Sequence, residues 1–86
     1  MTTKAEQRAR HQEYLAAVRA GQAAAAGLIE ALARVGVTIP SLRASEPVAG
    51  NAFVELGGCN AGTATMLAEV INAAADAVPG LRVATR

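Results

Sequence analysis

The residues best suited to chemistry lie in one glycine-rich segment, Gly57-Gly58-Cys59-Asn60-Ala61-Gly62-Thr63, between a predicted strand and the predicted start of a helix. Such a turn offers free backbone amides and the positive end of a helix dipole to an anion. The candidate anion-binding residues are therefore Gly57, Gly58, Cys59 and Asn60. The simpler and favoured interpretation is that the glycines only permit a sharp turn from strand to helix.

Known nucleotide-binding motifs do not fit this segment. Gly57 and Gly62 have the spacing of the phosphate loop GxxxxGK[ST], but Thr63 replaces its lysine and Ala64 replaces its Mg²⁺-binding hydroxyl. Cys59 and Asn60 interrupt the dinucleotide pattern GxGxxG. The sequence thus argues against nucleotide hydrolysis.

Cys59 stands one residue before the helix cap, where a helix dipole can activate a thiol. A nucleophilic cysteine also needs a base, and the only histidine, His11, is distant in the sequence. One Cys and one His do not supply the four ligands of a structural zinc site. We therefore predict a structural Cys59, with no catalytic residue, metal or cofactor.

Basic residues near the N-terminus point to a different class of partner. Lys4, Arg8 and Arg10 could contact nucleic-acid phosphates. The net charge of +1 and two aromatic residues argue against a dedicated nucleic-acid binder. Residues 1–20 carry a net charge of +2 and residues 50–78 one of −3, so the two regions could attract one another in an assembly.

The element carrying these basic residues is a long predicted helix. Thr3 and Glu6 form a capping box at its start, and Gly36 fits a left-handed stop that lets Val37 pack back on Leu32. A helix over about 4–35 would be about 47 Å long, whereas a globule of this size is about 30 Å across. Either the helix breaks near a glycine, or its apolar face continues onto a second copy of the chain, which we favour.

One face of this helix is the predicted oligomer interface. Its members fall on one arc at 100° per residue: Tyr14, Leu15, Val18, Gly21, Ala25, Leu28, Ile29 and Leu32. Gly21 with Ala25, and Ala23 with Gly27, are small residues four apart, and this spacing predicts a close helix crossing. The alternative is that these alanines are exposed filler.

The rest of the chain is predicted as a loop over 36–51, a strand over about 52–56, a helix over about 60–78 capped by Asn60, and a tail over 79–86. A single strand cannot satisfy its own backbone groups. It therefore needs a partner, either a C-terminal strand near 81–85 or its twin in a dimer.

Composition limits the core. The 86 residues are 52% apolar, but 22 of them are alanine and only Phe53 and Tyr14 are aromatic. A chain with so few large apolar groups is near the limit of stability by itself, and one cysteine excludes an internal disulfide. A partner chain is the remaining way to complete the core.

Localisation follows from the termini and the hydropathy pattern. The polar start is unlike a secretory signal, and the apolar stretch 23–37 is shorter than a membrane span. We expect a cytoplasmic protein with no membrane partner. Seven arginines against one lysine, with abundant alanine, suggest the coding bias of a GC-rich, actinobacterial genome.

These observations predict a single small domain over 1–86, mainly α with a minor β element, forming a helix-mediated homodimer. The expected function is a non-enzymatic, self-associating accessory or adaptor protein with an assembly or regulatory role. The alternative is a small DNA-associated regulator that uses the basic half of the first helix. The third is an enzyme or anion-binding module at the Gly57–Thr63 turn.

Overall fold

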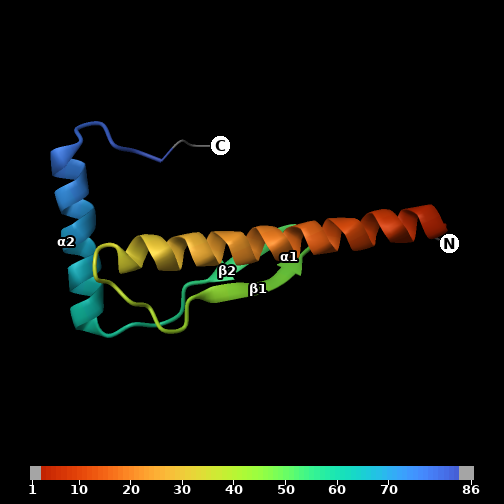
Figure 1. Ribbon diagram of the computed structural model, residues 1–86, viewed down its shortest axis with the longest axis horizontal. Coiled ribbons are helices and arrows are strands. Elements are labelled where there is room, and N and C mark those ends of the chain that lie inside the picture. The colour runs from red at the N-terminus through yellow and green to blue at the C-terminus, as the bar shows by residue number, and fades with distance from the viewer. Residues whose placement is uncertain (1–2, 84–86) are drawn as a thin grey trace.

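The computed structural model describes residues 3–83 as two helices and a hairpin (Figure 1). In chain order these are α1 (Lys4–Ala33), β1 (Arg43–Val48), β2 (Asn51–Glu55) and α2 (Ala61–Ala77). The hairpin lies along α1, and α2 lies across the C-terminal end of α1. The prediction of a mainly α fold with a minor β element is confirmed.

Helix α1 begins and ends as its local sequence predicts. The Thr3 side chain accepts a hydrogen bond from the Glu6 amide (3.1 Å). At the other end Gly36 has a φ of +76°, and the Val37 amide donates to the Leu32 carbonyl (2.9 Å). The helix is unbroken from Lys4 to Ala33, so the alternative of a break at a glycine is wrong.

The predicted loop over 36–51 is wrong in part, because it contains β1. Strand β2 pairs antiparallel with β1, placing Arg43 opposite Glu55 and Ser45 opposite Phe53. The strand β2 therefore has its partner within the chain. The prediction that it pairs with a C-terminal strand or with its twin in a dimer is wrong. The register shifts between Ser45 and Val48, the stretch that contains Pro47, which has no amide hydrogen to donate.

Helix α2 is capped as predicted. The Asn60 Oδ1 accepts a hydrogen bond from the Thr63 amide (2.8 Å), and the helix ends at Ala77, before Pro79 and Gly80. Residues 81–83 form no strand. The rest of the possible C-terminal strand lies outside the described residues.

The core lies between α1 and the hairpin. A Cβ on Gly21 would lie 3.3 Å from the Phe53 carbonyl oxygen and 3.6 Å from the Ala44 Cβ, so the hairpin crosses α1 closely at this glycine. A backbone therefore does approach α1 closely at Gly21, but it belongs to the chain's own hairpin, so the predicted helix crossing is wrong at this glycine. The core is as thin as its composition predicts, and its buried apolar residues are Ala17, Ala25, Leu32, Val37 and Leu42.

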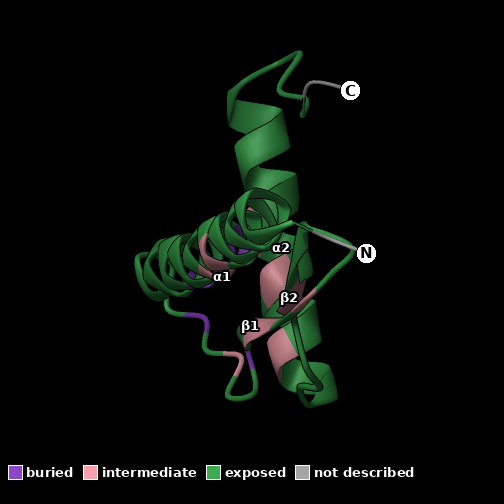
Figure 2. Ribbon diagram, turned by 90° about the vertical axis from the view of Figure 1, so that its right-hand side faces the viewer, coloured by how far each residue is buried: buried purple, intermediate pink, exposed green. Residues whose placement is uncertain are grey.

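Two parts of the described chain lie outside this core. Residues 4–13 of α1, which we call the N-terminal arm, are all exposed, and the hairpin reaches only as far as Glu13. No Cα atom of α2 comes within 8 Å of a Cα atom in α1, β1 or β2, and no residue of α2 is buried (Figure 2). The molecule is accordingly elongated, with extents of 54 × 29 × 18 Å.

Over residues 3–83, α1 is the one helix long and apolar enough to cross a membrane by length and composition alone. This differs from the expectation of no such segment, because alanines such as Ala16, Ala17 and Ala20 extend the apolar character of the helix toward the N-terminus beyond the stretch 23–37. Core helices of soluble proteins and signal sequences also have this length and composition, so the finding is weak evidence that α1 spans a membrane.

Candidate functional site

The glycine-rich turn before α2 has one residue with a strict structural role. Gly57 has a φ of +75°, and a Cβ at this position would collide with Ser41. Gly58 has no atom within 4 Å of its Cβ position. Gly57 therefore lets the chain leave β2 close against residue 41, in agreement with the favoured interpretation of this segment as a sharp turn.

The same turn forms a shallow, open hollow at the N-terminus of α2. Its lining residues are Thr38, Pro40, Gly58, Cys59, Asn60 and Thr63, none of which is charged. The Asn60 side chain already accepts the hydrogen bond of the Thr63 amide, which removes one free donor. An anion would find backbone amides and the Thr38 and Thr63 hydroxyls here, but no lysine or arginine lines the hollow to neutralise its charge.

The structure separates the two residues that a thiol enzyme would need. Cys59 is free and exposed beside the start of α2. His11 lies on the N-terminal arm, at the opposite end of the molecule (Figure 1). Within residues 3–83 no three His, Cys, Asp or Glu side chains gather in a way that could hold a metal.

The basic candidates are only partly brought together. Lys4 and Arg8 line a shallow surface depression with Gln7 and His11 on the N-terminal arm. Arg10 is not among its lining residues. All of them are exposed. The N-terminal arm therefore places two basic side chains, Lys4 and Arg8, on one side and does not form a continuous basic surface.

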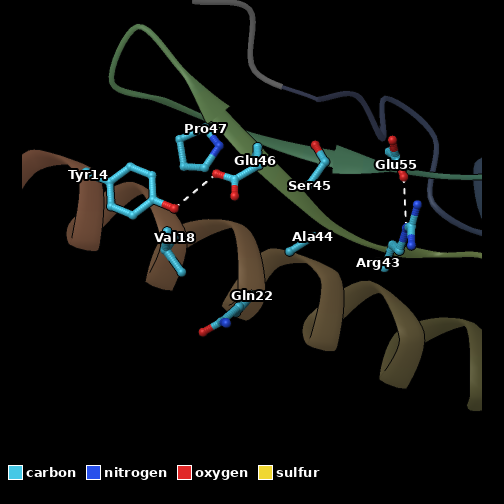
Figure 3. Close-up of a pocket in the computed structure, with 9 residues that line it drawn as sticks. All are labelled: Tyr14, Val18, Gln22, Arg43, Ala44, Ser45, Glu46, Pro47 and Glu55. Atoms are coloured by element: carbon cyan, nitrogen blue, oxygen red, sulfur yellow. Dashed lines mark hydrogen bonds and ion pairs between the residues drawn. The ribbon is translucent and has the colours of Figure 1, made fainter.

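An open groove of about 660 Å³ lies between α1 and β1 (Figure 3). The Tyr14 hydroxyl on α1 donates a hydrogen bond to Glu46 Oε2 on β1 (3.0 Å). At the other end of the groove, Arg43 Nε lies 2.8 Å from Glu55 Oε2, joining the two strands. Both carboxylates of the groove are thus engaged by neighbouring side chains.

The carboxylate of Glu46 in the groove affects the pKa of Tyr14. Its pKa is raised above the ordinary value of 10.0, first by the hydrogen bond it donates to Glu46 and then by the negative charge of that carboxylate. A nearby carboxylate disfavours the phenolate. Tyr14 is therefore held as a neutral hydrogen-bond donor and is not prepared as a base or nucleophile.

Sequence reasoning did not find this groove, because it treated β1 as a loop. The signal that was present is a pair of opposite charges, Arg43 and Glu55, placed on either side of a Gly-containing turn. Opposite charges facing each other across two strands stabilise a hairpin. That pair indicates the register from Arg43 to Ser45 but not the shift between Ser45 and Val48.

The predicted oligomer interface on α1 is divided by the hairpin. Gly21, Ala25 and Leu32 are buried within the chain. Leu15 and Val18 are half-buried. The members that remain exposed are Tyr14, Leu28 and Ile29. Half of this face is therefore occupied by the chain itself, and only its margins are open to a partner.

Comparison with protein-family models, with curated proteins and with solved structures gives no match to this chain.

Proposed function

We propose that this chain is a self-associating, non-enzymatic accessory or adaptor protein that works in the cytoplasm as part of an assembly. The observation that supports the proposal is the large solvent-accessible surface area of a single copy. Its accessible area is 6909 Å², whereas a compact monomer of its mass, 8.7 kDa, would expose about 4,700 Å². The difference is about 2,200 Å² for each chain.

The shape of the chain supports the same conclusion. The radius of gyration is 17.3 Å, against about 12 Å for a compact domain of this length. Many large apolar side chains are also left exposed, among them Ile29 at 49%, Phe53 at 48% and Ile71 at 58%. Obligate homodimers bury about 1,000–2,500 Å² on each subunit, so the excess surface is of the size such an interface requires.

Charged groups in α1 favour an aqueous partner over a membrane. Arg19 and Glu30 interrupt the apolar stretch of this helix, and each charge near the centre of a bilayer is costly. The hairpin already packs on the buried side of α1, at Gly21. A water-soluble assembly satisfies both features.

Light scattering coupled to size exclusion tests the proposal. At micromolar concentration we expect a measured mass of at least twice the chain mass of 8.7 kDa. The fraction of chains in the oligomer should rise with protein concentration. A mass of one chain at every concentration up to the millimolar range would overturn the proposal.

A further inference from the structure

We infer that α2 is the surface through which a second copy of this chain binds; the inference rests on the self-association proposed above and names its interface. Helix α2 has a wide apolar face formed by Met66, Leu67, Val70, Ile71, Ala74 and Val78. We call this set the α2 face. These residues recur at the three- and four-residue spacings of a helix that packs against another helix.

The chain itself leaves most of the α2 face uncovered. Met66 is 47% exposed, Ile71 58% and Val78 53%, while Leu67 and Val70 are half-buried. The backbone of α2 approaches no other helix or strand of the described chain. An amphipathic helix takes most of its stability from packing its apolar face, so α2 requires a partner surface.

The α2 face matches a second copy of itself. It carries no charged side chain, because Glu69 and Asp76 lie with Asn72 on the opposite side of the helix. Two copies can therefore approach face to face with their carboxylates pointing away from the contact. A two-fold interface uses the same patch on both subunits, and a wholly apolar patch satisfies that requirement without like-charge repulsion.

The charge of α2 argues against a lipid surface as the occupant. Helices that lie on membranes carry lysine and arginine on the polar face, which attract anionic lipids. The polar side of α2 has two acidic residues, and no basic residue occurs between Ala61 and Ala77. An anionic membrane would repel this helix.

The area available is consistent with this occupant. A stable interface of ordinary size buries about 800 Å² on each partner, which is well below the excess of about 2,200 Å² derived above from the mass of the chain. The excess belongs to the whole chain, and the α2 face supplies part of it.

Ile71→Glu and Met66→Glu test the inference, with Asn72→Glu as the matched control. All three add one carboxylate to an exposed position of the same helix, so one chain alone tolerates each of them. In light scattering we expect the first two to raise the dissociation constant of the dimer by about 100-fold or more, because both copies are changed. Asn72→Glu should leave the constant within a few-fold of wild type.

A crosslinking experiment does not depend on charged variants folding. With Cys59→Ser as the background, Val70→Cys should form an interchain disulfide on mild oxidation, because Val70 lies near the middle of the α2 face. Asn72→Cys should not. Equal crosslinking of the two would overturn the inference.

The outcomes separate the two proposals. A wild-type protein of one-chain mass contradicts self-association itself. A wild-type dimer that Ile71→Glu and Met66→Glu leave intact retains self-association and rejects α2 as its interface. Binding of wild type to anionic phosphatidylserine vesicles, with no dimer in solution, would replace the second copy by a lipid surface and would also reject the inference.

Discussion

Gly21 of α1 lies directly beneath Phe53 of β2, so close that a Cβ on the glycine would be 3.3 Å from the Phe53 carbonyl oxygen. Because Gly21 has no side chain, the backbone of the hairpin can pack directly against α1 at this position. Gly27, six residues further along the same helix, has no atom within 4 Å of its Cβ position. The two glycines have the same helical conformation and different surroundings, which makes them a natural pair for mutation.

Gly21→Leu should destabilise the fold, because the added side chain must displace the hairpin; overfilling a packed site costs about 1–3 kcal/mol. Gly27→Leu should stabilise the chain by about 0.5–1 kcal/mol, since leucine favours a helix and meets open space. Urea unfolding followed by circular dichroism, at one fixed protein concentration, measures both changes. Equal effects of the two substitutions would contradict the hairpin crossing.

Tyr14 should titrate above the ordinary tyrosine pKa of 10.0, because Glu46 accepts its hydroxyl hydrogen and opposes the phenolate. The stability from this contact is present below that pKa and is lost as the pH rises through the raised value. Tyr14 is the only tyrosine, so the ultraviolet absorbance of tyrosinate reports it alone. Glu46→Gln should return the midpoint toward the ordinary value, and an unchanged midpoint would mean that the contact is absent in solution.

Gly57→Ala should lower the free energy of unfolding by more than about 1 kcal/mol, since alanine is strained at positive φ and its Cβ would collide with Ser41. Gly58→Ala is the control, because no atom surrounds its Cβ position, and it should stay within about 0.5 kcal/mol of wild type. Thermal or urea unfolding compares the two variants. If Gly58→Ala proved the more damaging, the described path of the turn would be wrong.

Cys59 should behave as an ordinary exposed thiol. It is free, no histidine or carboxylate lines the hollow beside it, and His11 lies at the far end of the molecule. Alkylation of the folded protein by iodoacetamide at pH 6 should be no faster than that of a free cysteine in solution. Faster alkylation in the folded state, lost on unfolding, would favour the enzyme hypothesis instead.

Local signals in the sequence predicted the helix ends accurately. The Thr3 and Asn60 caps each use one side-chain oxygen and one amide three residues away, so their geometry is set within a single turn. The left-handed Gly36 stops α1 within two residues of the predicted end. These features depend on neighbours in the chain and are readable without the fold.

Strand β1 is not predicted because its local sequence is atypical of a hairpin. Pro47 interrupts the strand pattern, and the turn at Ala49 and Gly50 lacks the Asn-Gly or Asp-Gly pair typical of a two-residue hairpin. Both turn residues nevertheless have positive φ, +51° for Ala49 and +77° for Gly50. An alanine in that conformation is strained and is held there by the strand pairing on either side, which local sequence does not reveal.

The small-residue crossing shows a different limit. The spacing of Gly21 and Ala25 correctly predicts that another backbone approaches α1 there. It does not say which backbone, because a glycine accommodates a strand as readily as a helix. The consequence for the candidate site is direct, since three of the eight predicted interface residues belong to the internal core.

The elongation of the chain also governs how it moves in water. A body measuring 54 Å along one axis and 18 Å along another meets more friction than a sphere of equal mass. It therefore diffuses more slowly, tumbles end over end more slowly than it spins about its long axis, and leaves a sizing column early. A single copy would resemble a larger globular protein by elution volume, so the mass has to be taken from scattered light.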